Sequence, residues 1–258
     1  MSATAIAARG VSKRFLLRHN RSPELKVRVL SMFHARHREQ IEEFWALRDV
    51  SLTIRTGEAV GLVGRNGSGK STFLRLVAGL HRPSAGSLLV ARHARVGTMV
   101  ELGVGFHPEL TGRDNARMNA SIYGFSRRQI DAMLPEIIEY SGLAHFIDQP
   151  LKSYSSGMQM RLGFAVAAQI DPDILLLDEI FSVGDAEFQQ RCLQTIQGLR
   201  ARGKTILFVS HSPESIEAVC DRVCVLDQGR LHFDGSVRDG LDAYAALRST
   251  PAPVVRPA

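Results

Sequence analysis

The chain has 258 residues, a length that fits one large domain or two small ones. Hydrophobic residues make up 45% and charged residues 22%, which excludes a disordered, collagen-like or disulfide-scaffold chain. The 32 Lys and Arg against 26 Asp and Glu give a net charge of +6. This excess of positive charge fits an anionic partner such as a nucleotide, a nucleic acid or a lipid surface, but does not distinguish among them.

The chain has three cysteines, Cys192, Cys220 and Cys224. This small, odd number argues against a disulfide framework. No second Cys or His cluster accompanies Cys220 and Cys224, so we expect small core side chains on a strand rather than metal ligands. No apolar run approaches the length of a membrane span, and the N-terminus lacks the pattern of a secretory signal. We therefore expect the chain to stay in the cytoplasm.

The first elements in chain order are a short strand and turn over residues 4–15 and a basic insertion over residues 16–44. Nine Lys and Arg against one acid lie between Arg9 and Arg38, with apolar residues interleaved. Part of this insertion could form a basic amphipathic helix near lipid headgroups or a membrane partner. A solvated surface segment is about equally compatible with the pattern.

From Trp45 onward the hydrophobic pattern is regular. Apolar residues alternate with polar ones from Leu47 to Ile54, as in a half-buried strand. Further strands are expected at 58–63, 174–177, 205–209, 223–226 and 231–233, and helices at 71–80, 126–142, 156–170, 185–201 and 213–220. This alternation predicts an α/β fold with a parallel sheet. The Pro-rich residues 249–258 are expected to form a disordered tail.

The strongest motif lies between the strand at 58–63 and the helix at 71–80. It fits the phosphate-loop pattern G-x-x-x-x-G-K-[ST], in which glycines turn backbone N–H groups toward phosphate oxygens. Lys70 is expected to reach the terminal phosphates and the Ser71 hydroxyl to ligate Mg²⁺. The predicted ATP-binding residues of this loop are Gly64, Arg65, Asn66, Gly67, Ser68, Gly69, Lys70, Ser71 and Thr72.

Two adjacent acids end the apolar run Ile174–Leu177. We assign Asp178 to Mg²⁺, because this ion binds carboxylates while keeping much of its water. Glu179 is then placed to deprotonate an attacking water. His211 follows the predicted strand 205–209 and could hydrogen-bond a terminal phosphate from the carboxyl edge of the sheet. The predicted catalytic residues are Lys70, Glu179 and His211.

A second anion site is predicted at the start of the helix 156–170. Ser155, Ser156 and Gly157 offer hydroxyls, backbone N–H groups and a helix N-terminus. Taken alone, this turn is an ordinary helix cap. One nucleotide cradle and a second phosphate-binding turn in the same chain are explained if two chains face each other head to tail.

Over residues 4 to 240 the chain resembles the ATP-binding-cassette ATPases. The matching motifs are the loop 64–71, the signature turn 154–158 (Tyr-Ser-Ser-Gly-Met, for the common Leu-Ser-Gly-Gly-Gln), the acids 178–179, Ser182-Val-Gly-Asp185 and His211. The resemblance implies a P-loop NTPase core over residues 1–248, an antiparallel β subdomain and a helical subdomain over about 103–170.

The resemblance also assigns two further residues. Phe15 stands where the family usually has an aromatic residue that stacks on adenine, and Trp45 is a weaker candidate. Glu101 stands where the family usually has a glutamine. A carboxylate can still ligate Mg²⁺ but cannot donate a hydrogen bond when ionised, which puts the usual coupling role of this position in doubt.

The stretches Glu101–Asn115, Ser153–Phe164 and Leu177–Asp185 look like those of the ATPase subunits that export O-antigen, capsule or teichoic-acid polymers. This likeness implies a homodimer with two ATP molecules at its interface and Mg²⁺ as cofactor. It also implies a polytopic membrane permease and a glycan substrate, with the chain on the cytoplasmic face of the membrane. The permease helix would dock near Glu101–Asn115.

Two other functions stay open at this stage. One is a cassette ATPase that acts on nucleic acid or ribosomes, which the net charge allows. Such cassettes usually occur as tandem pairs or carry a coiled coil in the helical subdomain, and neither is present in this sequence. The other is the ATPase of a small-solute importer, which the absence of Gln at 101 and the insertion 16–44 disfavour. No nucleic-acid partner is expected.

Overall fold

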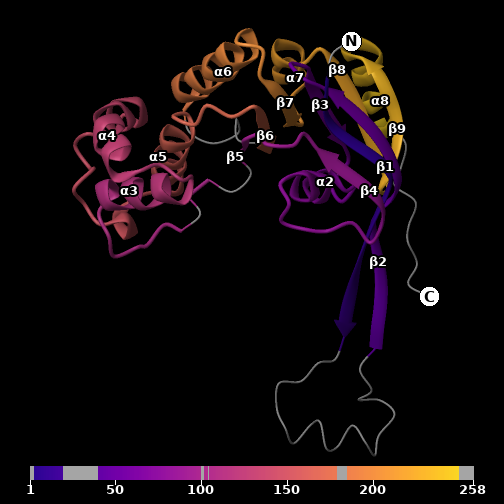
Figure 1. Ribbon diagram of the computed structural model, residues 1–258, viewed down its shortest axis with the longest axis horizontal. Coiled ribbons are helices and arrows are strands. Elements are labelled where there is room, and N and C mark those ends of the chain that lie inside the picture. Colours follow the sequence, from indigo (N-terminus) through magenta and orange to yellow (C-terminus); the bar gives the residue numbers. More distant parts are fainter. Residues whose placement is uncertain (1–2, 20–39, 100–101, 104, 179–184, 250–258) are drawn as a thin grey trace, which may run out of the picture.

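The computed structural model describes residues 3–19, 40–99, 102–103, 105–178 and 185–249. The described residues form two sheets with helices packed around them (Figure 1). The strands are β1 (Thr4–His19), β2 (Gln40–Arg55), β3 (Ala59–Gly64), β4 (Ala85–Val90), β5 (Val96–Met99), β6 (Ile174–Asp178), β7 (Thr205–Val209), β8 (Arg222–Asp227) and β9 (Arg230–Ser236). The helices are α2 (Lys70–Val77), α3 (Gly112–Ile122), α4 (Arg127–Ser141), the 3-10 turn η2 (Leu151–Ser153), α5 (Ser156–Ala167), α6 (Ala186–Ala201), α7 (Pro213–Val219) and α8 (Val237–Ser249).

The larger sheet has the order β5-β6-β7-β3-β8-β9. Its strands pair in parallel except β9, which forms an antiparallel hairpin with β8 through the pair Asp227 and Arg230. The parallel strands are buried along most of their length. Helices α5 to α8 cover one face, and α2 together with the smaller sheet covers the other. This confirms the expected α/β fold, and the hairpin consists of the two strands expected at 223–226 and 231–233.

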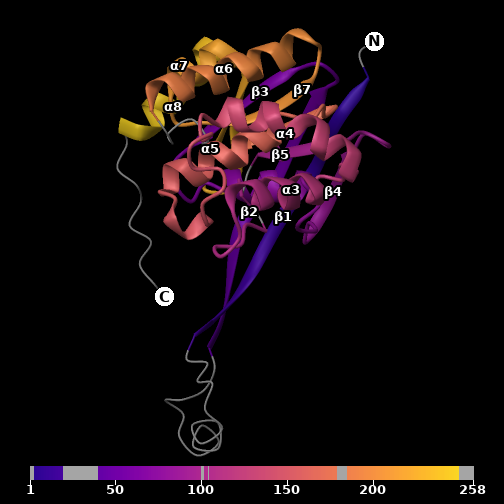
Figure 2. The same ribbon diagram turned by 90° about the vertical axis from the view of Figure 1, so that its left-hand side faces the viewer.

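The smaller sheet is antiparallel, in the order β2-β1-β4. Its β1 and β2 arms are longer than the sequence predicts. The pairing continues from Thr4 and Arg55 to His19 and Gln40, so residues 16–19 and 40–44 are strand rather than insertion. Figure 2 shows these arms leaving the body of the molecule as a paired ribbon. Residues 20–39 of the insertion, where the predicted amphipathic helix would lie, fall outside the described residues.

Helices α3, α4 and α5 gather into a separate group on one side of the molecule (Figure 1). Their shared core contains Ala116, Ile137 and Leu162. Ser126 and Gln129 form a capping box at the start of α4, and Gly142 ends that helix in a left-handed conformation, close to the predicted bounds 126–142. The prediction missed α3 and α8. It placed a disordered tail from residue 249, whereas α8 includes Ser249.

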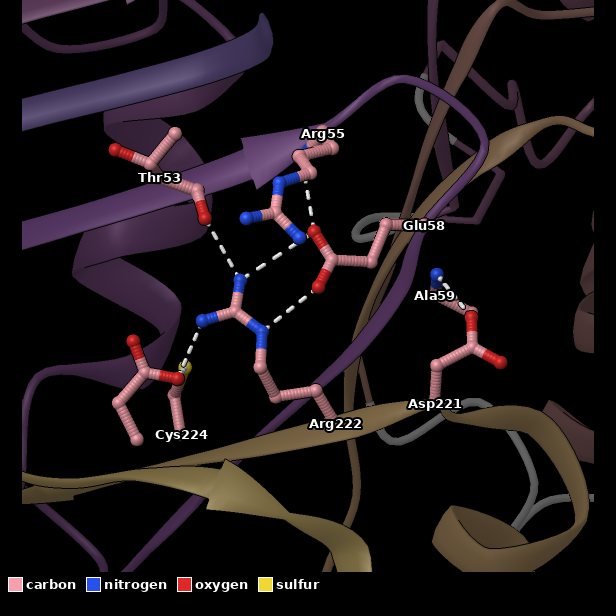
Figure 3. Close-up of polar contacts among 8 residues, drawn as sticks. Thr53, Arg55, Glu58, Ala59, Asp221, Arg222 and Cys224 are labelled. Carbon is pink, nitrogen blue, oxygen red and sulfur yellow. Dashed lines mark hydrogen bonds and ion pairs between the residues drawn. The ribbon is translucent and has the colours of Figure 1, made fainter. Parts of the chain in front are cut away.

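A half-buried ion-pair network ties β2 to the edge of the larger sheet (Figure 3). The Arg222 guanidinium donates to Glu58 at 2.7 Å, to the Thr53 carbonyl at 2.7 Å and to Asp234. Glu58 also accepts from the backbone N–H of Arg55 at 2.8 Å. Every group has a partner, so this junction holds the two sheets in one relative position.

All three cysteines are buried thiols. Cys224 lies on β8 as expected, whereas Cys220 caps the end of α7 instead of lying on a strand. Burial raises the pKa of Cys192 to about 12, which keeps this thiol protonated and unreactive. Within the described residues, no group of three His, Cys, Asp or Glu side chains has the arrangement of a metal site.

Candidate functional site: a phosphate-binding pocket

The loop between β3 and α2 folds around close backbone approaches. A Cβ atom at Gly64 would overlap the carbonyl oxygen of Leu226, and one at Gly69 would lie 2.6 Å from the carbonyl oxygen of Ala46. Gly69 also has a left-handed φ of 105° where α2 begins. Glycine is therefore required at both positions for steric reasons.

Lys70, the first residue of α2, is buried beneath this loop. Its Nζ donates to the carbonyl oxygens of Gly64 at 2.8 Å and Arg65 at 3.0 Å. Burial lowers the pKa of Lys70, and the nearby Asp178 carboxylate opposes that shift. The loop thus holds the ammonium group in place, with its charge offset only in part by Asp178 and two carbonyl dipoles.

The loop also leaves a buried polar atom unsatisfied. Ser68 is 2% exposed, and its Oγ has no hydrogen-bond partner among the described residues. Beside it lies a pocket of about 290 Å³. The residues that line the pocket are Phe44, Ala46, Asn66, Gly67, Ser68, Gly69, Lys70, Ser71, Thr72, Asp178 and His211. An unpaired hydroxyl, a buried lysine and a glycine cradle fit phosphate groups.

The pocket contains seven of the nine predicted loop residues. Gly64 and Arg65 lie behind it, and contribute the carbonyl oxygens that hold Lys70. The Arg65 side chain turns away, toward α8, where its guanidinium donates to the carbonyl oxygen of Leu247. Ser71 and Asp178, two of the three predicted Mg²⁺ ligands, line the same pocket.

Parallel pairing brings the predicted acid and histidine to the same edge of the sheet. Asp178 ends β6 directly opposite Val209 on β7, so His211 follows two residues beyond that pair. Both side chains line the phosphate pocket. Glu179, Glu101 and the segment Ser182–Gly184 fall outside the described residues, so their roles stay predictions.

His211 also contacts the C-terminal helix. Its Nδ1 lies 3.0 Å from the hydroxyl of Tyr244 on α8. Burial lowers the pKa of His211, and the positive charges of Lys70 and Arg248 lower it further, against the opposing effect of Asp178. A neutral imidazole at neutral pH follows from this environment.

The aromatic residue that lines the pocket is Phe44, which the sequence interpretation did not single out. Phe44 is 46% exposed and pairs with Phe15 across β1 and β2. Phe15 is not among the lining residues; its ring packs edge-on against His81, with centroids 5.6 Å apart. The Arg14 guanidinium lies 6.0 Å from the Trp45 ring centroid. Phe15 as an adenine contact stays a prediction, with Phe44 as the better-placed ring.

The second predicted anion site lies on α5, in the helical group. The Ser155 side chain caps the helix by accepting from the backbone N–H of Met158 at 3.2 Å. Ser155 and Ser156 are exposed, and neither they nor Gly157 line the phosphate pocket of the same chain. The Tyr154 hydroxyl donates to the carbonyl oxygen of Phe146 at 2.7 Å, so the residue that replaces the common leucine is held in the core. One chain therefore keeps the two predicted phosphate-binding turns apart.

Sequence reasoning missed Phe44 and Tyr244. The stripe Val237, Leu241 and Tyr244 has helical spacing and packs on the larger sheet, so a signal for α8 was present. For Phe44 the strand pattern is interrupted by charged neighbours, and only the pairing with β1 brings it to the pocket.

A parallel sheet, a glycine-rich loop with a buried lysine, and an acid at the adjoining strand end define a phosphate-loop nucleoside triphosphatase. The profile of the family described as ABC transporter matches residues 47–182. The O-antigen export system ATP-binding protein RfbB of Klebsiella pneumoniae is 45% identical over 91% of this chain and 94% of its own length. The teichoic acids export ATP-binding protein TagH of Listeria innocua is 39% identical over 93% of this chain and 69% of its own. This chain belongs to the ABC transporter family, as an ATPase domain.

Solved structures agree on the fold. A dimeric post-hydrolysis state of the ATP-binding cassette MJ0796, bound to ADP and Pi, superposes with a TM-score of 0.70 at 22% identity. That match covers 90% of this chain and 99% of the other. An ATP-binding subunit of an ABC transporter gives a TM-score of 0.70 at 23% identity, with 95% of each chain covered. None of the described helices is both long and apolar enough to cross a membrane.

Proposed function

We propose that this chain is the ATP-hydrolysing subunit of an ABC transporter that exports a cell-surface polysaccharide or lipid-linked glycan across the cytoplasmic membrane. The observation that carries the proposal is the phosphate pocket, which joins Lys70, Ser71, Asp178 and His211. The class of cargo rests on the names of the relatives, which are O-antigen and teichoic acid export proteins.

In this proposal the pocket holds the phosphates of ATP. The loop N–H groups and Lys70 bind their oxygens. Phe44 offers a ring for the base, and Phe15, its neighbour on β1, is the other predicted base contact. Ser71 and Asp178 would hold Mg²⁺, with Glu101 as the third predicted ligand. When bound, that ion offsets negative charge on the phosphates. Glu179 takes the proton of the attacking water, so Glu179→Gln is expected to bind ATP without turnover.

The proposed working unit is a homodimer. The exposed N-terminus of α5 with Ser155, Ser156 and Gly157 supports this, because this predicted anion site does not line the phosphate pocket of its own chain. In the dimer each such turn covers the phosphates held by the other chain. ATP binding then closes the interface and hydrolysis opens it.

The proposed membrane partner is a polytopic permease, to which this chain binds at the cytoplasmic face of the membrane. Leu110, which lies in the predicted docking segment, is 38% exposed. Ile122 is 55% exposed, and its side chain lies against Gly105 of the same segment. Exposed apolar side chains at this segment fit a partner helix. No nucleic-acid partner is proposed.

The test uses a tagged chain that replaces the chromosomal copy, purified from detergent-solubilised membranes. We expect a polytopic membrane protein in equal amount, and loss of surface glycan when the tagged chain carries Lys70→Ala. That variant controls for assembly, because it should still bring down the membrane protein. Co-purification of ribosomes or nucleic acid with no membrane protein would instead support a cassette ATPase that acts on nucleic acid or ribosomes. Unchanged glycan with lost solute uptake would indicate an importer.

A further inference from the structure

His211 lies between the phosphate pocket and helix α8. It lines the pocket together with Lys70 and Asp178. On the other side, its Nδ1 is 3.0 Å from the Tyr244 hydroxyl. A second pocket, of about 340 Å³, lies between the loop and α8 and is lined by Arg65, Asn66, His211, Tyr244 and Arg248.

Several contacts fix the position of the Tyr244 hydroxyl. Tyr244 is 5% exposed and belongs to the core on this face of the sheet. Gly240, one turn earlier on α8, is packed so closely that a Cβ there would lie 2.7 Å from Val223 of β8. Leu247, almost one turn later, accepts from the Arg65 guanidinium of the phosphate loop. Helix α8 is thus attached to the sheet and to the loop on either side of Tyr244.

The chemistry of the pocket requires one particular imidazole tautomer. Burial, Lys70 and Arg248 favour the neutral form of His211, which carries a single N–H. A phosphate oxygen in the pocket can accept hydrogen bonds but cannot donate one. Because Nδ1 faces Tyr244, the N–H that reaches a phosphate oxygen must be on Nε2. Nδ1 then carries no proton and must accept a hydrogen bond. A tyrosine hydroxyl can supply that bond as a donor.

We propose that Tyr244 is a positioning residue that donates its hydroxyl proton to Nδ1 of His211 and so places the N–H of Nε2 toward the phosphate pocket. The identity of the acceptor as a nucleotide phosphate, and with it the argument for the Nε2 tautomer, rests on the proposed function. The tautomer itself can be measured without nucleotide, so the two are tested separately. The C-terminal helix thereby becomes part of the machinery that orients the histidine.

The first test is the ¹⁵N spectrum of the imidazole rings in the nucleotide-free full chain, which distinguishes the two neutral tautomers. The chain has nine histidines, so the His211 signal is assigned by its loss in His211→Gln. We expect His211 to carry its proton on Nε2, and Tyr244→Phe to leave a mixture of both tautomers. A wild-type proton on Nδ1, or an unchanged spectrum in Tyr244→Phe, would overturn the proposal.

The second test is ATP turnover. Loss of one hydrogen bond to a neutral group predicts a fall in kcat of about threefold to tenfold in Tyr244→Phe. Tyr244→Phe should add nothing in a His211→Gln background, because the hydroxyl acts through that ring. Equal falls in both backgrounds would contradict the proposal. If the wild-type chain hydrolyses no ATP, the proposed function fails, whereas the tautomer result still decides this inference.

Tyr140→Phe is the matched control. The Tyr140 hydroxyl also makes a half-buried side-chain hydrogen bond, at 2.7 Å to Thr195 Oγ1, and neither residue lines the phosphate pocket. Both variants remove one hydroxyl, so similar losses of Tm are expected. Only Tyr244→Phe should change the His211 spectrum, and a change of that spectrum in Tyr140→Phe would show a general loosening of the fold instead.

Discussion

The phosphate loop before α2 and the turn that begins α5 both contain glycine, and their glycines serve different purposes. At Gly64 and Gly69 of the phosphate loop, a Cβ would run into the carbonyl oxygens of Leu226 and Ala46. At Gly157 on α5 a Cβ would have Ser155 Oγ as its nearest neighbour, 3.8 Å away. The first turn needs glycine so that it can fold, whereas the second would accept a side chain without strain.

The difference separates a loop whose shape is fixed by contacts within its own chain from a turn that is left open. The phosphate loop holds Lys70 with two of its own carbonyl groups and opens onto a lined pocket. The turn at α5 is capped by Ser155 and otherwise faces solvent. The open space at Gly157 is what an anion brought by a second chain would need.

The largest expected effect comes from Lys70→Ala. This substitution removes the buried ammonium group from the phosphate loop. We expect ATP hydrolysis to fall by at least about a hundredfold, as for loss of a principal charge-stabilising donor. The measurement is steady-state phosphate release, with circular dichroism as the check on folding. A well-folded variant with near-normal turnover would remove Lys70 from the phosphate site.

Gly157→Asp tests the open site. The side chain fits, because nothing crowds this position, but its carboxylate would repel a phosphate. We expect ATP binding to the isolated chain to persist and turnover to fall by about tenfold or more. Gly157→Ala is the matched control and should keep most of the activity.

Mixing Gly157→Asp with Lys70→Ala sharpens this test. In a head-to-tail dimer of one chain of each kind, one site carries both changes and the other carries neither. The mixture should therefore regain turnover that neither variant has alone. Absence of any recovery, with mixed dimers demonstrated by two different tags, would argue against sites shared between chains.

Gly64→Ala introduces a steric clash in the phosphate loop. The new Cβ would meet the backbone of Leu226 and the buried Ser68 Oγ, neither of which is a flexible chain end. We expect a loss of about 1–3 kcal/mol in the free energy of unfolding, measured by urea titration, together with weaker ATP binding. A variant as stable as Gly157→Ala would show that the two turns do not differ as described.

The smallest expected effect concerns the contact with the adenine base of ATP. Phe44→Ala should weaken ATP binding by about twofold to tenfold through lost stacking, while binding of inorganic triphosphate stays unchanged. Phe15→Ala is the comparison, since Phe15 lies across from Phe44 without lining the pocket. A larger loss in Phe15→Ala would restore Phe15 as the adenine contact.

Much of the core could be predicted from local pattern. The helices at 127–141 and 186–201 begin at side-chain caps and were expected within one residue, as was the strand that ends at Asp178. The long arms of β1 and β2 were not expected. Their outer residues include exposed Leu16, Leu17 and Phe44, so no buried face imposes an alternating pattern there.

The sequence by itself determined the phosphate loop and the alternation of strands and helices, because both depend on residue types at short spacing. Only the tertiary structure decided which distant groups meet. Strand register brought Asp178 and His211 to one edge, pairing of β1 with β2 placed Phe44 beside the loop, and packing of α8 set Tyr244 against His211. Such contacts depend on the arrangement of whole elements, which no short stretch of residues encodes.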